Sequence, residues 1–160
     1  RSPSAPQPLS SLDFLFLETP ERTCLHAVAE SHSPAAPKAV QELVSWDNSL
    51  LTTLDANGQT PLHVAAYWGN IDTVKALMLQ AEELMFAEDS KLQRTPLHLA
   101  ATLEEVEVVD YLAARGGRTL ILSEDKDGKT ALDLAAPQAR MMLMAHLCSE
   151  SKSRTRSASC

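Results

Sequence analysis

The feature that most constrains the fold of this chain is a seven-residue segment that recurs at a nearly constant interval. It reads TPLHVAA at residues 60–66 and TPLHLAA at 95–101, with looser copies, TALDLAA and TCLHAVA, at 130–136 and 23–29. The threonines that open these copies are separated by 37, 35 and 35 residues. Self-similarity at a period of about 20 to 50 residues is typical of proteins built from stacked repeats. We therefore expect four copies of one structural unit.

Each copy has the chemistry of a helix start. In the copy at residues 60–66, Thr60 is a preferred N-cap, and Pro61 suits the first turn because it has no N–H to leave unsatisfied. Leu62 is expected to point into the core, and the paired alanines keep the helix slim so that neighbouring repeats can approach closely. Apolar residues three and four apart then predict a second helix in the last three copies: Val74, Leu77, Met78; Val109, Leu112, Ala113; Leu143, Met144, Leu147.

Short polar segments lie before the repeated threonines and predict projecting loops, which we call fingers. Residues 55–58 end in Asn-Gly and residues 125–128 end in Asp-Gly. Both pairs supply the positive φ of a tight turn. The corresponding segment at residues 89–94 is one residue longer and lacks glycine, so we expect a less regular finger there.

The T-P-L-H-x-A pattern at a period near 33 residues resembles that of the ankyrin-repeat family. The resemblance implies an all-α fold, a curved solenoid of about four helix-turn-helix repeats with short finger loops. We expect this domain to span residues 12–149, after a flexible segment at 1–11 and before a disordered tail at 150–160. The repeats are expected to start near residues 18, 55, 89 and 125.

Departures from the family pattern predict local differences. Glu104 and Ala139 stand where the family usually has the glycine between the two helices. We expect these turns to close differently, or through a longer helix end. Residues 31–37 form an insertion in the first repeat, which should bulge as a loop before a second helix at about residues 38–45.

Charge and composition limit the classes of function. The net charge of −7 argues against a nucleic-acid partner, which would need a clustered basic face. No apolar run reaches 18 residues, so we expect no membrane span. Cys24, Cys148 and Cys160 cannot all pair, and the first two are interpreted as small buried apolar residues. This usage favours a reducing compartment, cytoplasmic or nuclear. Because the chain begins with Arg rather than Met, we expect a fragment or a processed product.

The repeated histidines are interpreted as structural. His26, His63 and His98 each stand three residues after the capping threonine, and equal spacing implies equal roles. In the family this histidine bonds the threonine and the backbone of adjacent loops, and Asp133 holds the corresponding place in the fourth copy. Cys24 with His26 and His32 lacks a fourth metal ligand, and no catalytic motif or phosphate-binding glycine loop is present. We predict a non-enzyme without cofactor or metal.

The candidate binding residues are those that the scaffold does not need. The resemblance places the residue before each threonine at a finger tip, and the seventh and eighth residues after it on the concave face. Tyr67, Trp68 and Leu103 would form an apolar patch there, and Trp and Tyr often carry interface energy. We predict a protein partner bound by this patch together with the following polar and basic residues: Thr102, Arg22, Gln59, Arg94, Lys129.

Three of the four residues before the threonines are basic, so we expect a basic ladder that favours a partner with an acidic surface. Two plainer interpretations stay open. In the first, Tyr67 and Trp68 only fill an uneven junction between repeats. In the second, the basic residues are scattered by chance along a solvated edge.

The predicted function is protein binding by a monomer. The finger segment at residues 90–95 also resembles the NF-kappa-B and inhibitor-of-kappa-B branch, which implies masking of a transcription factor and a role in signalling. A targeting or substrate-recruiting module of a larger enzyme or host-directed effector is the alternative, and a purely structural spacer is a third. In the tail, Ser157 and Ser159 follow arginines, as basophilic kinases require.

Overall fold

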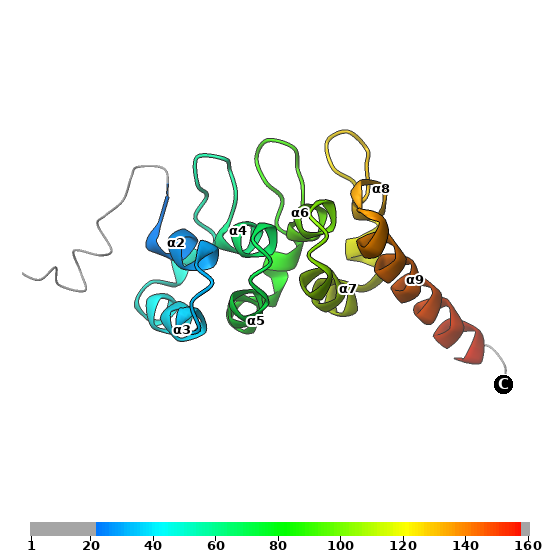
Figure 1. Cartoon of the computed structure of the whole chain (residues 1–160), viewed down its shortest axis with the longest axis horizontal. Helices are drawn as coiled ribbons and strands as arrows, with labels where there is room; N and C mark the ends of the chain where they lie inside the picture. Colours follow the sequence, from blue (N-terminus) through cyan, green and yellow to red (C-terminus); the bar gives the residue numbers. More distant parts are fainter. Residues whose placement is uncertain (1–21, 158–160) are drawn as a thin grey trace, which may run out of the picture.

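The computed structural model describes residues 22–157, with side chains described as far as residue 151. Helices stack in pairs along a curved row, and fingers project from one side of it (Figure 1). One layer contains the first helix of each pair: α2 (Cys24–Glu30), α4 (Pro61–Tyr67), α6 (Pro96–Thr102) and α8 (Ala131–Leu134). The other contains the second helices: α3 (Ala36–Trp46), α5 (Ile71–Gln80), α7 (Val106–Ile121) and α9 (Pro137–Ser157). This is the predicted all-α solenoid.

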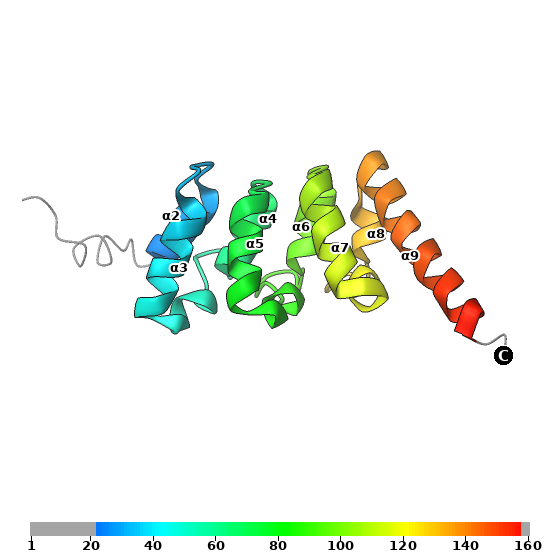
Figure 2. The same ribbon diagram turned by 90° about the horizontal axis from the view of Figure 1, so that it is seen from below.

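The connections between repeats follow a common plan. Two short 3-10 helices, η1 (Asn48–Leu51) and η2 (Glu82–Phe86), lead from α3 and α5 toward the next finger. Within residues 22–157 no β-strand forms, apart from a single bridge between Glu124 and Thr130 at the base of the third finger. Seen from below, α3, α5 and α7 lie side by side as an outer layer (Figure 2).

The core is a thin apolar seam between the two layers. The leucine of the repeated segment is fully buried in the first three repeats, at Leu25, Leu62 and Leu97. The second helices contribute the residues predicted from their spacing, including Val74, Leu112 and Leu143. The interpretation of Cys148 as a buried apolar residue is wrong, because it is exposed on α9, as is Met144 at 52%, where no described repeat packs.

The repeated histidines link the repeats, as the sequence predicted. In α4, Nδ1 of His63 lies 2.8 Å from Oγ1 and 3.3 Å from the backbone nitrogen of Thr60. Its Nε2 lies 2.8 Å from the carbonyl oxygen of Arg94, at the base of the next finger. Since a carbonyl oxygen only accepts, Nε2 carries the hydrogen and Nδ1 accepts. His26 and His98 repeat this arrangement with the carbonyl oxygens of Gln59 and Lys129.

The fourth repeat replaces the histidine with Asp133 and keeps only half of this network. Its Oδ2 accepts hydrogen bonds from the backbone nitrogen and the hydroxyl of Thr130, at 3.0 and 2.9 Å. These bonds confirm the similar polar role expected of Asp133. Within the described residues the Asp133 carboxylate bonds only inside its own repeat, since it carries no N–H to donate and α9, not another finger, follows it.

The turn at Glu104 closes in the same way as a glycine turn, so the expectation of a different closure is wrong there. Glu104 has a φ of 61°, close to the 68° of Gly69. The backbone bond from Glu105 to Ala100 (3.1 Å) matches the one from Asn70 to Ala65 (3.0 Å). A left-handed residue other than glycine costs roughly 1–2 kcal/mol, which the surrounding turn offsets.

The turn expected at Ala139 lies earlier in the chain. Helix α8 ends at Leu134 and α9 begins at Pro137, so Ala139 is buried within the first turn of α9. Proline is favoured at the first position of a helix, and Pro137 therefore sets where α9 begins. The insertion after α2 forms the expected loop, although α3 begins at Ala36, two residues before the expected start.

The second finger is as regular as its neighbours, although we expected otherwise. Gln93 takes the positive φ (53°) that Gly58 and Gly128 take in the other fingers. The backbone nitrogen of Asp89 bonds the carbonyl oxygen of Arg94 at 2.9 Å and closes the loop as in the other two fingers. Oδ1 of Asp89 accepts from the backbone nitrogens of Leu92 and Arg94, which holds the longer loop in place.

The ends of the chain differ in part from expectation. The flexible segment at 1–11 and the start of the domain at residue 12 lie outside the described residues. At the other end, α9 continues to Ser157, so residues 150–157 are helical where we expected a disordered tail. Extending an existing helix costs far less than nucleating one, and Glu, Lys and Arg are good helix formers. Residues 158–160 again lie outside the described part.

Candidate partner-binding surface

Two exposed aromatic side chains stand at the end of α4. Six residues of this helix, from Pro61 to Ala66, are buried, whereas Tyr67 is 44% and Trp68 43% exposed. Their rings meet edge to face, with centroids 5.7 Å apart and planes at 79°. Such a geometry is a favourable one for aromatic rings, so each ring holds the other in position. We call these two residues the aromatic pair.

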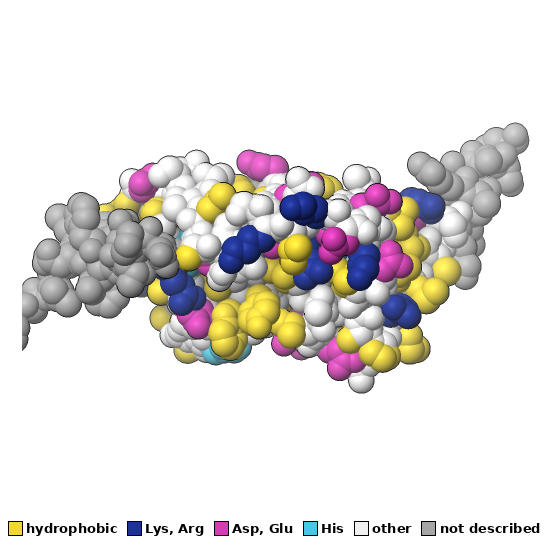
Figure 3. All heavy atoms as spheres, turned by 90° about the horizontal axis from the view of Figure 1, so that it is seen from above, with side chains coloured by type: hydrophobic (Ala, Val, Ile, Leu, Met, Phe, Trp, Pro, Cys, Tyr) yellow, Lys and Arg dark blue, Asp and Glu magenta, His cyan; other side chains and the backbone are white. Residues whose placement is uncertain are grey.

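The aromatic pair lines an open groove of about 480 Å³ between α2, the first finger and the start of α6. The apolar part of its lining is completed by Val64 and Leu99, which are nearly buried. The charged part consists of Arg22, Glu30 and Asp55. A hydrophobic patch bordered by charged side chains is visible on the finger side of the molecule (Figure 3). We call the open space lined by these residues the groove.

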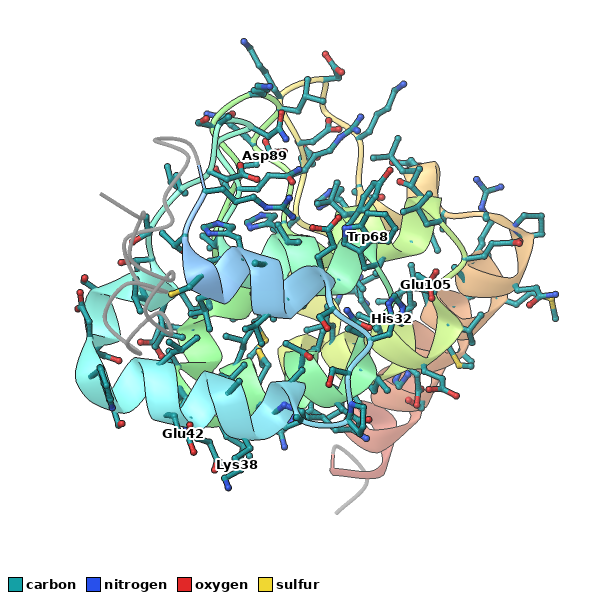
Figure 4. The ribbon with its side chains drawn as sticks, turned by 60° about the vertical axis from the view of Figure 1, so that its left-hand side comes forward. His32, Lys38, Glu42, Trp68, Asp89 and Glu105 are labelled. Carbon is teal, nitrogen blue, oxygen red and sulfur yellow. The ribbon has the colours of Figure 1, made fainter. Side chains whose placement is uncertain are left out.

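The inserted loop of the first repeat contacts the base of the aromatic pair. Nε2 of His32 lies 3.1 Å from the carbonyl oxygen of Trp68, 36 residues further along the chain. Figure 4 shows His32, Trp68 and Glu105 on one side of the molecule. The Glu105 carboxylate lies against Gly69, where a Cβ would be only 2.0 Å from its Oε2. The segment from Trp68 to Gly69 is therefore held from both neighbouring repeats.

Leu103 and Thr102 occupy the equivalent end of α6, one repeat further along. Leu103 is 41% exposed. Thr102 is exposed too, but its hydroxyl donates to the carbonyl oxygen of His98 at 2.8 Å within its own helix. Neither residue lines the groove. The predicted apolar patch is therefore centred on the aromatic pair, with Leu103 as an extension toward the third repeat.

The residues before the threonines lie at the bases of the fingers, so the placement at the tips is corrected. The carbonyl oxygens of Gln59, Arg94 and Lys129 accept from the histidines of the preceding repeats, which brings this position next to the helices. In the first finger the tip is the turn at residues 56 and 57. Neighbouring fingers also bond to each other, with Lys91 Nζ 2.9 Å from Asn57 Oδ1.

Two cations of the expected basic ladder are paired with acids of the same chain. Arg94 Nε lies 3.1 Å from Oδ2 of Asp125, whose side chain is completely buried. Arg22 forms an ion pair with Glu30 at the side of the groove. Among the four residues before the threonines, only Lys129 offers its charge to an acidic partner.

The Asp125 carboxylate is buried at the base of the third finger and is held by several hydrogen bonds. Burial by itself would raise its pKa. The backbone N–H of Lys129, the Arg94 guanidinium and the backbone N–H of Asp127 outweigh this effect, so the pKa of Asp125 lies below its usual value. Arg94 therefore joins the second finger to the third through its bond to Asp125.

Sequence reasoning missed two charged residues of the groove and one contact beside it. Glu30, at the end of α2, was not considered, and Asp55 was considered only as the start of the first finger. His32 was considered only as a metal ligand. The insertion at residues 31–37 was the signal that could have identified His32, because a loop present in one repeat alone makes contacts that the other repeats lack.

Models of the ankyrin family match most of the chain. A model of three ankyrin repeats matches residues 8–86, and a model of a single ankyrin repeat matches residues 92–123. The chain belongs to the ankyrin-repeat family. Such repeats generally bind other proteins. The fourth helix pair, α8 and α9, lies beyond both matches, and its Thr130–Asp133 bonds resemble the Thr–His bonds of the preceding repeats. No curated protein matches the chain, so the narrower inhibitor-of-kappa-B resemblance gains no support from a relative.

The remaining expectations concern sites outside the groove. Among the described residues, no three His, Cys, Asp or Glu side chains are grouped so as to hold a metal ion. No helix within the described ankyrin array has the length and hydropathy to cross a membrane. Ser157 is the last residue of α9, and Ser159 lies outside the described residues. Phosphorylation of these serines stays a prediction.

Proposed function

We propose that this ankyrin-repeat array is a non-catalytic module that binds one protein partner in the groove, with the aromatic pair as its anchor. The observation that carries the proposal is the sudden change of burial at the end of α4, from six buried residues to two exposed aromatic ones. Both rings are less than half exposed but line an open groove, so they offer a partner apolar area to bury.

The groove has the mixed character of a protein-binding site. Its apolar lining offers area to bury, while its charged residues can select among partners. Leu103 extends the apolar surface toward the third repeat, so an extended or folded partner can contact more than one repeat. Masking of a transcription factor, a role in signalling and a cytoplasmic or nuclear location stay predictions within this proposal.

The test compares proteins captured from a cell lysate by the wild type and by two variants. One variant replaces Tyr67, Trp68 and Leu103 with alanine. The matched control is Trp46→Ala, because Trp46 is equally aromatic, 59% exposed, and lies at the end of α3 outside the groove. Thermal unfolding of all three proteins must agree within a few degrees. We expect the triple variant to lose partners that the Trp46 variant retains. Equal capture by all three proteins would contradict the proposal.

A further inference from the structure

Equivalent aspartates in the first and third fingers differ in one respect. Each begins its finger and uses Oδ1 to accept two backbone N–H groups. Asp55 accepts from Asn57 and Gln59 at 2.8 and 3.0 Å. Asp125 accepts from residues 127 and 129 at 2.9 and 3.0 Å. Their second oxygens differ: Oδ2 of Asp125 bonds Arg94, whereas Oδ2 of Asp55 accepts no hydrogen bond from any described residue.

The repeat plan places an arginine near Asp55 as well, but that arginine bonds elsewhere. Arg22 precedes its threonine as Arg94 does. Its guanidinium pairs with Glu30 instead, and both side chains remain partly exposed, at 40% and 37%. Asp55 is only half-buried and lines the groove, whereas Asp125 is closed off. The position that Arg94 fills at Asp125 is therefore open at Asp55.

The surroundings of Asp55 suit a guanidinium better than another cation. A carboxylate oxygen accepts a charge-assisted bond from guanidinium, and the planar group stacks on aromatic faces. Tyr67 and Trp68 line the same groove as Asp55, so a guanidinium that reaches this carboxylate enters the space beside the two rings. The groove also holds two carboxylates against one guanidinium, so it lacks one positive charge. Charge complementarity thus favours a cationic occupant.

We infer that the groove receives an arginine side chain from the partner protein, whose guanidinium bonds Oδ2 of Asp55 and stacks against the aromatic pair. The chain contains its own example of the carboxylate–guanidinium bond, which Arg94 forms with Oδ2 of Asp125. This inference rests on the proposed function and names the chemistry of the partner. It predicts a basic contact segment, in contrast to the acidic surface expected from the ladder.

The test uses a single arginine as its probe. N-acetyl-arginine N-methylamide is titrated into the isotope-labelled protein while the two indole N–H resonances are followed by NMR. The chain has two tryptophans, so Trp46 is an internal control. We expect a saturable shift at Trp68, with a millimolar dissociation constant, and none at Trp46. The lysine analogue should bind at least about threefold more weakly, because it can neither stack nor fork its hydrogen bonds.

The decisive variant is Asp55→Asn. Its Oδ1 can still accept the two backbone bonds, so the finger is kept while the charge is removed. The matched control is Asp127→Asn, an exposed carboxylate in the third finger. We expect the dissociation constant to rise at least about fivefold in D55N and to stay within about twofold of the wild type in D127N. No shift at Trp68, equal shifts at both indoles, or unchanged binding by D55N would overturn the inference.

Two further results distinguish a failure of the arginine contact from a failure of protein binding at the groove. If sedimentation detects a dimer that the arginine analogue and D55N both dissociate, the occupant is a second copy of this chain, and a separate partner is ruled out. If the triple variant loses its partners but the wild type does not bind the analogue, protein binding at the groove stands and the arginine contact is wrong.

Discussion

Nε2 of His63 lies 2.8 Å from the carbonyl oxygen of Arg94, 31 residues further along the chain. This bond links the second repeat to the second finger, which leads into the third repeat. The same ring accepts from Thr60 on its other side. One buried imidazole therefore satisfies the start of its own helix and the base of the next finger. The stacking of the second repeat against the next finger therefore depends on this side chain.

Replacing His63 with alanine should destabilise the fold strongly. The change leaves buried donors and an acceptor without partners, and each such group costs roughly 1–3 kcal/mol. We expect a loss of about 3 kcal/mol in the free energy of unfolding, measured with urea. The control is His32→Ala, whose ring is exposed and whose loss should cost less than about 0.5 kcal/mol. Similar losses in the two variants would show that the buried network contributes little.

Stability should fall as the pH is lowered below about 6.5. Burial of His26, His63 and His98 lowers the pKa of each ring, although hydrogen bonds to carbonyl oxygens oppose this. The unfolded chain therefore takes up protons near the ordinary pKa of about 6.5, while the folded chain does so only at lower pH. Urea unfolding at pH 7.5, 6.5 and 5.5 should give decreasing free energies. A flat or rising series would mean that these rings are not held neutral by the fold.

Glu104→Gly should stabilise the protein. The residue adopts a φ of 61°, and glycine removes strain of roughly 1–2 kcal/mol while adding about 0.5–1 kcal/mol of chain entropy to the unfolded state. We expect a net gain of about 0.5–1 kcal/mol in chemical denaturation. The reciprocal change, Gly69→Ala, should destabilise, because its φ is 68° and the new Cβ would contact Glu105. Destabilisation by Glu104→Gly would show that the Glu104 side chain makes an offsetting contribution.

Removing Arg94 should cost more than removing an exposed ion pair. Arg94→Ala leaves the buried Asp125 carboxylate without its guanidinium, and we expect a loss of about 2 kcal/mol, typical of a hydrogen bond to a charged group. Lys38→Ala is the control, because Lys38 and Glu42 are 4.0 Å apart and mostly exposed (Figure 4). That change should cost less than about 0.5 kcal/mol. A double-mutant cycle with Asp125→Asn measures the coupling directly, and a coupling near zero would contradict the proposed role of Arg94.

The repeated elements were predictable because they obey local rules that recur. Thr60, Pro61 and His63 specify a helix start whatever its surroundings, and the spacing of Val74 and Leu77 specifies the buried side of the next helix. Ankyrin repeats stack through such local units. The fold class therefore followed from the sequence before any contact was known.

The remaining details depend on contacts between distant segments. Gln93 and Glu104 adopt glycine-like φ values because hydrogen bonds of the surrounding turns impose them, and residue type alone argues against that conformation. The pairing of Arg22 with Glu30, which leaves Asp55 open, depends on where a long side chain settles. The sequence identified the aromatic pair as candidates, but the groove beside it required the structure.

Occupation of the groove by a partner protein can be measured by site-specific photo-crosslinking in cells. A photoreactive phenylalanine analogue replaces Tyr67 in one protein and Trp46 in another, so that the same reactive group is presented in the groove and on α3. Crosslinked proteins are then identified by mass spectrometry. We expect a defined partner to be linked at position 67 and not at position 46, and the link at position 67 to be lost when Trp68 is also changed to alanine. The same partner linked equally at both positions, or at position 46 alone, would contradict this expectation.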